Sequence, residues 1–120
     1  MRRIAVFSVF RVASYRGASN AYNGTAEEFA QRISKGSHVV DFHTTWCGPC
    51  KAIAPQFESL ANSNPNIGFM KIDLDENEEI GALHDIRSIP TFLAFREGKV
   101  VARLEGADKS KLAELVQKAQ

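Results

Sequence analysis

Apolar residues along the chain recur at two spacings, one typical of helices and one typical of strands. The first helical pattern has apolar positions three to four residues apart: Ala26, Phe29, Ala30 and Ile33. Thr25 followed by Glu28 fits a capping box, in which two side chains satisfy free N–H groups at the start of a helix. The pattern therefore predicts a helix from Thr25 to about Lys35, ended by Gly36.

The rest of the chain alternates between strand-like and helix-like patterns. Strand-like apolar runs lie at residues 39–42, 67–74, 91–95 and 100–104. Helical spacing recurs at residues 50–62, in a segment that carries Ile80 and Leu83, and in the set Leu112, Leu115, Val116 and Ala119. Pro55 predicts a kink, the acidic run 75–79 favours a helix start, and residues 97–99 predict a hairpin. Alternating strands and helices imply parallel pairing, so we expect an α/β fold with a mixed central sheet sandwiched by helices.

Length and composition indicate one domain with an ordinary core. The chain has 120 residues, of which 44% are hydrophobic and 24% charged, enough to bury a core without metal or disulfide staples. A formal net charge of +1 gives no support for binding nucleic acid or a membrane surface. No apolar run approaches the roughly 18 residues that a membrane helix needs. We expect a soluble, monomeric domain.

The first twenty residues differ from the rest of the chain. They contain four Arg, three Ser and no acid, a composition typical of an organellar transit peptide. Alternatives are a folded or floppy extension, or a secretory signal, although the apolar stretch 4–10 is only seven residues long and ends at Arg11. We expect residues 1–20 to be a targeting or disordered extension and residues 21–120 to be the domain. The expected location is the mitochondrion, with the cytoplasm as the alternative.

The chain has two cysteines, Cys47 and Cys50, three positions apart. Two are too few and too close for the disulfide framework of a small secreted protein. The pair is therefore catalytic, redox-sensing or metal-binding. A zinc site would have to recruit two of the three histidines His38, His43 and His84, which lack the close spacing usual in such sites.

The spacing of the cysteines suits thiol–disulfide exchange. A thiolate is the attacking species, and the start of a helix favours a thiolate over a thiol. Cys47 lies at a predicted junction of strand and helix, and Pro49 suits a first helical turn. Cys50, one turn further, can displace whatever disulfide partner Cys47 captures. Cys47 is thus the expected nucleophile and Cys50 the resolving thiol.

Three separated motifs resemble the thioredoxin family: Val40-Asp41-Phe42, Trp46-Cys47-Gly48-Pro49-Cys50-Lys51 and Ile89-Pro90-Thr91-Phe92. The resemblance covers about residues 22–119 and includes Pro55, residues 73–77, Gly98 and residues 106–107. It implies a thioredoxin fold, and the composition of residues 1–20 adds the expectation of an organellar form with an N-terminal extension. It also implies a cis peptide bond before Pro90, beside the disulfide, with backbone near Ile89 binding an extended client segment. An NADPH-dependent thioredoxin reductase would recharge the pair, and no bound cofactor or metal is expected.

Asp41 interrupts a strand that is expected to be buried, where a carboxyl group is costly unless it has a partner or a task. We expect it to take the proton of Cys50 as that thiol attacks, with a pKa raised by burial and moderated by Lys71, which matches the family's partner lysine. A satisfied structural carboxyl is the alternative. His43 shares a strand face with Asp41, where it either perturbs the site's protonation or has no redox role. His38 and His84 are interpreted as surface residues at element ends.

We therefore expect a protein-disulfide reductase that acts on client proteins through Cys47 and Cys50. The expected substrate-binding residues are Trp46, Gly48, Pro49, Ile89 and Pro90. The Gly-Pro pair between the cysteines lacks an additional cation, which favours a reductant over a strong oxidant. The alternatives are an oxidase or isomerase with a less reducing pair, and a redox-inactive or zinc-holding binding module on the same fold.

Overall fold

The computed structural model describes residues 18–120 of the protein. Most of the predicted N-terminal extension, residues 1–17, lies outside the described residues. The strands are β1 (Ser19–Ala21), β2 (Ser37–His43), β3 (Gly68–Asp73), β4 (Thr91–Arg96) and β5 (Lys99–Glu105). The helices are α2 (Ala26–Ile33), α3 (Gly48–Ser63), α4 (Glu78–Leu83) and α5 (Lys109–Ala119).

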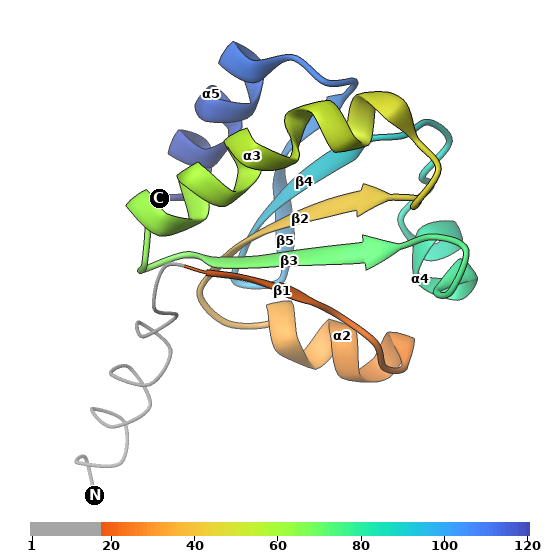
Figure 1. Ribbon diagram of the computed structural model, residues 1–120. Coiled ribbons are helices and arrows are strands. Elements are labelled where there is room, and N and C mark those ends of the chain that lie inside the picture. The colour runs from red at the N-terminus through yellow and green to blue at the C-terminus, as the bar shows by residue number, and fades with distance from the viewer. Residues whose placement is uncertain (1–17) are drawn as a thin grey trace, which may run out of the picture.

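The strands form one mixed sheet in the order β1-β3-β2-β4-β5. β1, β3 and β2 run parallel, and β4 and β5 continue the sheet antiparallel. Helices α3 and α5 cover one face, and α2 and α4 lie on the other (Figure 1). The predicted α/β architecture with a mixed, helix-covered sheet is confirmed.

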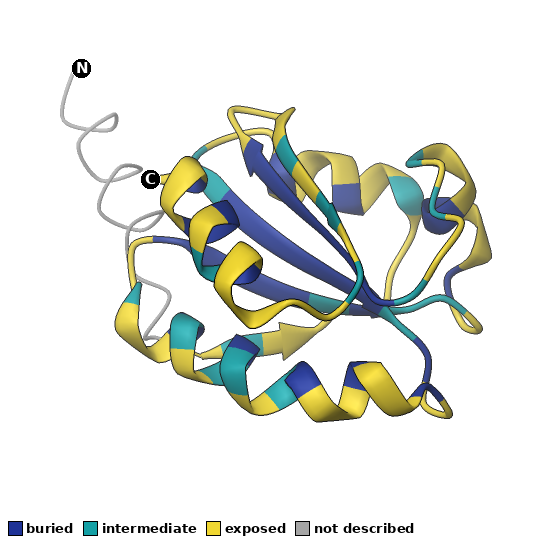
Figure 2. Ribbon diagram, turned by 90° about the horizontal axis from the view of Figure 1, so that it is seen from above, coloured by how far each residue is buried: buried dark blue, intermediate teal, exposed yellow. Residues whose placement is uncertain are grey.

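The core has two layers, one on each face of the sheet. Phe57 of α3 and Leu112 of α5 pack on Val39 of β2, whereas Phe29 of α2 packs on the opposite face with Val40. Neighbouring residues of a strand point to opposite faces, which explains why β2 is buried on both. Figure 2 shows the buried residues concentrated in the central strands and the exposed residues on the outer sides of the helices. Among residues 18–120, no helix is long and apolar enough to cross a membrane.

Local signals set the helix starts. Thr25 accepts a hydrogen bond from the Glu28 backbone, and the Glu28 side chain accepts one from Thr25 N at 3.0 Å, so the predicted capping box is confirmed. Helix α2 ends at Ile33, two residues before the predicted end at Lys35. Helix α3 begins at Gly48, two residues earlier than predicted, and continues through Pro55 to Ser63.

The first strand was not predicted. Its three residues, Ser19–Ala21, have no apolar alternation and join the sheet by pairing with β3, with Ser19 opposite Phe69 and Ala21 opposite Lys71. The Ser19 hydroxyl also donates a hydrogen bond to Glu58 of α3. Ser19 and Asn20 therefore pair with the sheet, although the sequence analysis placed the start of the domain at residue 21.

The interpretation of His38 as a surface residue is wrong, whereas His84 lies at the end of α4 as expected and is only partly exposed. His38 is 4% exposed, because it lies within the central strand β2, and its Nε2 is 2.8 Å from the Lys35 carbonyl oxygen. His84 is half-buried, with its ring edge-on to Phe29 and Phe95 at centroid distances of 5.5 and 5.6 Å. Both histidines therefore pack within the fold.

Candidate active site

The two cysteines lie where β2 leads into α3. Strand β2 ends at His43, and Cys47 is the N-cap of α3, with Pro49 in the first turn. Cys47 and Cys50 form a disulfide with their Cα atoms 5.2 Å apart. The Cys50 backbone N–H donates to Cys47 Sγ at 3.1 Å. The predicted position of Cys47 at the start of a helix is confirmed.

This position favours negative charge on the Cys47 sulfur when the pair is reduced. The first turn of a helix carries unpaired N–H groups and the positive end of the helix dipole. The first turn of α3 contains no acidic residue that would oppose this effect. An N–H group already points at the sulfur of Cys47, so the site can stabilise a thiolate without rearranging its backbone.

Asp41 is a buried acid on β2, the strand that leads to the cysteines. It is 1% exposed, and its Oδ1 has no hydrogen-bond partner among the described residues. Burial raises the pKa of Asp41 to about 7, the Glu58 carboxylate adds to that rise, and the Lys71 ammonium opposes it. Lys71 is the register partner of Asp41 on β3. The carboxyl group can thus exchange a proton near neutral pH.

A pocket of about 240 Å³ is lined by both this acid and Cys50. Its lining brings together Asp41, His43, Thr44, Thr45, Cys50, Lys51, Ala54 and Lys71. The structure therefore places Asp41, Lys71 and Cys50 around one space, although they come from β2, β3 and α3. The half-buried His43 lines the same space.

The surface beside the disulfide is apolar and open. The Trp46 side chain is 68% exposed, and its Nε1 donates to Asp75 Oδ2 at 3.0 Å. Gly48 and Pro49 are also exposed. Trp46 is thus held by one polar contact at its edge, and most of the residue is exposed to solvent.

The Ile89–Pro90 peptide bond is cis, as the resemblance implied. Pro90 directly precedes β4, whose first residue Thr91 is paired with Phe42 near the end of β2. Strand register therefore brings the Pro90 loop and the segment that leads to Cys47 to the same end of the sheet. Ile89 is half-buried and Pro90 is buried.

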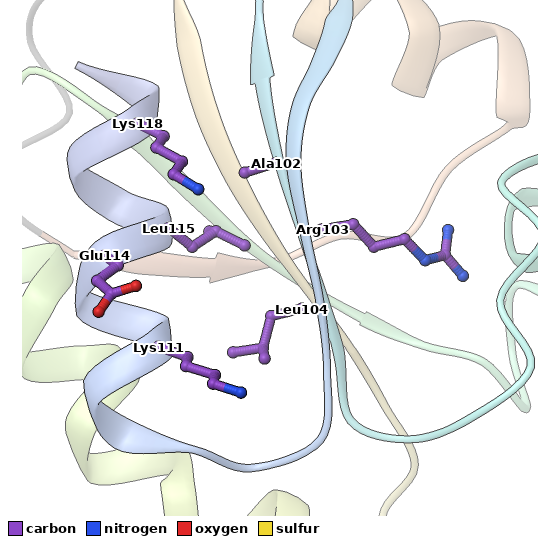
Figure 3. Close-up of a pocket in the computed structure, with 7 residues that line it drawn as sticks. All are labelled: Ala102, Arg103, Leu104, Lys111, Glu114, Leu115 and Lys118. Carbon is purple, nitrogen blue, oxygen red and sulfur yellow. The ribbon is translucent and has the colours of Figure 1, made fainter.

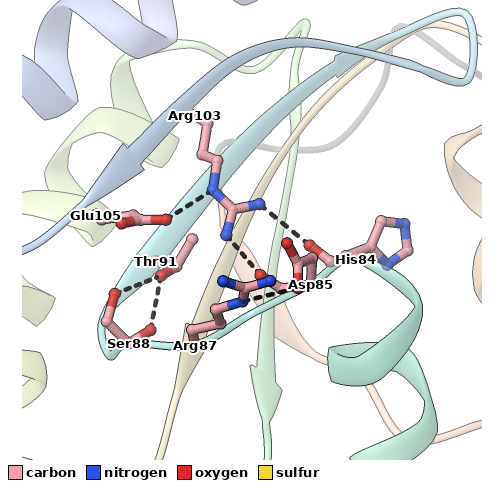
Figure 4. Close-up of polar contacts among 7 residues, drawn as sticks. All are labelled: His84, Asp85, Arg87, Ser88, Thr91, Arg103 and Glu105. Carbon is pink, nitrogen blue, oxygen red and sulfur yellow. Dashed lines mark hydrogen bonds and ion pairs between the residues drawn. The ribbon is translucent and has the colours of Figure 1, made fainter.

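Polar contacts anchor the segment that leads to Pro90 (Figure 4). The Arg103 guanidinium of β5 donates to the carbonyl oxygens of His84 and Asp85 at 3.1 and 2.7 Å. Its Nε also donates to Glu105 at 3.0 Å. Nearer Pro90, the Thr91 hydroxyl donates a hydrogen bond to the Ser88 carbonyl oxygen at 2.6 Å. Sequence reasoning missed Arg103 and Glu58 because their partners are distant along the chain.

A second pocket, of about 190 Å³, lies between β5 and α5 (Figure 3). Two lysines, Lys111 and Lys118, flank an apolar floor that includes Leu104 and Leu115. Neither cysteine nor Asp41 lines it, so it is not part of this site. Within residues 18–120, no three His, Cys, Asp or Glu side chains lie together where they could hold a metal ion.

Comparison with known proteins gives consistent matches. The family model described as Thioredoxin matches residues 20–118. Thioredoxin-1 of Saccharomyces cerevisiae is 39% identical over 93 residues, which cover 77% of this chain and 90% of that protein. A thioredoxin of Chlamydia trachomatis is 39% identical over 95 residues, covering 78% and 93%. The structure of spinach chloroplast thioredoxin f superposes with a TM-score of 0.81 at 33% identity, covering 91% of this chain and 92% of that one.

Proposed function

The chain belongs to the thioredoxin family, and from that premise we propose how its residues divide the work of dithiol–disulfide exchange. The protein is a thiol–disulfide oxidoreductase whose cysteine pair is recharged, as is standard in the family, by thioredoxin reductase. One observation carries the assignment of roles. The Cys47 sulfur caps α3, and Cys50 lies within hydrogen-bonding reach in the first turn of that helix.

The reaction begins from the reduced pair. The Cys47 thiolate attacks one sulfur of a client disulfide, so that a Cys47–client disulfide forms and the other client sulfur leaves as a thiolate. Cys50 then loses its proton and attacks the Cys47 sulfur, which breaks the bond to the client. The client gains two electrons and, after taking up two protons, is a dithiol. The protein is left with the Cys47–Cys50 disulfide, the state seen in the structure.

Asp41 is the acceptor for the Cys50 proton in this scheme. A general base acts best when its pKa is near the working pH, and the pKa of Asp41 is raised by burial to about 7. The pocket shared by Asp41 and Cys50 supports transfer directly or through a water molecule. Lys71 keeps part of the carboxyl population ionised, because its positive charge opposes the effect of burial.

Client proteins bind across the exposed surface of Trp46, Gly48 and Pro49, together with the loop that carries the half-buried Ile89 and the buried Pro90. The exposed indole of Trp46 supplies apolar contact area beside the disulfide. Pro90 has no N–H group, and its carbonyl oxygen accepts from Gly106 N at 2.9 Å. Hydrogen bonds to an extended client segment are therefore made by the backbone near Ile89. This surface fits a segment of protein that carries a disulfide.

Trapping tests the roles of the two cysteines. With Cys50→Ser, a client disulfide should remain bound through Cys47 as a mixed disulfide that mass spectrometry of the peptides identifies. Cys47→Ser should abolish the adduct. An adduct that persists through Cys50 in Cys47→Ser, at the same rate, would reverse the assignment. Reduction of insulin by the intact protein with NADPH and thioredoxin reductase tests the activity itself.

We also propose that the protein works in the mitochondrion. The support is the composition of residues 1–20, with four Arg, three Ser and no acid. A full-length fusion to a fluorescent protein at the C-terminus should co-localise with a mitochondrial marker. A matched fusion with Arg2, Arg3, Arg11 and Arg16 changed to Gln should not. Equal cytoplasmic fluorescence from both fusions would contradict the proposal.

A further inference from the structure

His43 lies between the buried acid and the outside of the active-site pocket. Asp41 and His43 lie two residues apart at the end of β2, Thr45 follows in the turn after the strand, and all three line the pocket. Their exposure rises in that order, from buried Asp41 through half-buried His43 to exposed Thr45. His43 is thus the titratable side chain of β2 between Asp41 and the rim.

Asp41 needs a route by which its proton can leave. Its Oδ1 has no hydrogen-bond partner among residues 18–120, and the group is almost fully enclosed. The Cα atoms of residues two apart on a strand lie about 7 Å apart, and Asp41 Oδ1 makes no direct hydrogen bond to His43. The pocket of about 240 Å³ has room for water between them. One bridging water can join the carboxyl oxygen to a ring nitrogen.

The groups around His43 favour a neutral imidazole near neutral pH. Burial lowers the pKa of His43, and the Lys71 ammonium of β3 lowers it further. Asp73, its register partner on β3, and the backbone hydrogen bond of Thr44 oppose the shift. The charged or ionisable groups that α3 brings to this region are Cys50 and Lys51, which line the pocket, and Glu58, which acts on Asp41. A neutral imidazole can accept a proton at one nitrogen and release another from the second.

We propose that His43 relays the proton of Cys50 from Asp41 to solvent through one bridging water. The inference rests on the proposed reductase function and deepens it. When Cys50 attacks the Cys47 sulfur, its proton passes to Asp41 and then, through the water, to one ring nitrogen of His43. The other ring nitrogen gives a proton to solvent, and the departing client thiolate takes up a proton from water. No electrons move in the relay, so His43 acts through Asp41 and does not touch the client.

The test compares full-length wild type, His43→Ala and the control Glu79→Ala, which removes an exposed titratable group outside the pocket. Stopped-flow fluorescence follows a single turnover, from mixing of the reduced protein with a fluorescent client disulfide to release of the client dithiol. At pH 7, release should slow several-fold in His43→Ala and stay unchanged in Glu79→Ala. The deficit should be largest near neutral pH. It should shrink in acid, where the imidazole is already protonated, and in alkali, where hydroxide takes the proton directly.

Imidazole added to the buffer separates proton transfer from a packing effect. It should restore most of the release rate in His43→Ala and leave wild type unchanged, because the substitution opens space for a free imidazole in the pocket. An unchanged release rate in His43→Ala would overturn the relay, as would a deficit that is constant with pH and insensitive to imidazole. If wild type itself fails to release the client dithiol, the proposed function of the cysteine pair fails instead.

Discussion

Replacing Asp41 by Asn should make the oxidised protein more stable, by an amount that grows with pH. In the unfolded chain this carboxyl group ionises at its ordinary pKa of 3.8, and in the folded protein burial raises that pKa to about 7. Between these values the folded state holds a proton that the unfolded state has lost. Rising pH in this window therefore destabilises the fold. Asparagine has a similar shape and cannot ionise, so the variant does not lose stability by this route as the pH rises.

The magnitude follows from the two pKa values. Each pH unit between them changes the free energy of unfolding by about 1.4 kcal/mol, and the effect levels off above the folded-state value. From pH 5 to pH 8 the wild type should lose about 3 kcal/mol relative to Asp41→Asn. The absolute difference at any one pH also includes the burial of the amide. The change with pH isolates the ionisation of Asp41.

Urea unfolding of both oxidised proteins, followed by circular dichroism at pH 5, 6, 7 and 8, measures this difference. Glu76→Gln is the matched control, because Glu76 is exposed and its loss should leave the dependence on pH unchanged. Parallel curves for wild type and Asp41→Asn across the whole range would refute the reasoning. They would mean that the carboxyl group ionises alike in the folded and unfolded chains.

Three further variants test other parts of the structure. Thr25→Ala removes one half of the capping box and should lower the free energy of unfolding by about 1 kcal/mol in urea titrations; no change would mean that the cap is dispensable. Trp46→Ala should alter stability by less than about 1 kcal/mol, since the ring is 68% exposed, yet slow insulin reduction several-fold and leave reaction with a small disulfide intact. Arg103→Met removes the contacts to the His84 and Asp85 carbonyls and should raise the KM for protein disulfides more than it lowers kcat. Equal effects on both constants would argue against a role in holding the Pro90 loop.

Much of the fold could be predicted because its signals are local. The capping box at Thr25 and Glu28 lies within four residues, and the apolar run at 39–42 identifies a strand buried on both faces. The placement of Cys47 at a helix start followed from the short distance between that run and the next helical pattern. Each of these features depends on residues within a few positions of one another. The spacing and backbone preferences of such residues can be read from the sequence.

Predictions from the sequence were missing or wrong where pairing or burial depends on segments far apart in the chain. Strand β1 has no apolar alternation and is held by backbone pairing to β3, about fifty residues away along the chain. Leu83 belongs to a helical pattern, yet it is 65% exposed, because α4 is short and turns only part of its surface to the core. His38 is polar but lies in the central strand, whose neighbours cover it.

The sequence by itself determined the helices, strands β2 to β5, the reactive pair and the acid placed in an apolar strand. Only the tertiary structure decided that Asp41, Lys71, His43 and Cys50 line one pocket, and that the Pro90 loop lies at the same end of the sheet as the cysteines. The physical reason is that periodicity fixes which face of an element is apolar. Strand order and register fix which faces meet, and these arise from contacts between segments far apart in the chain.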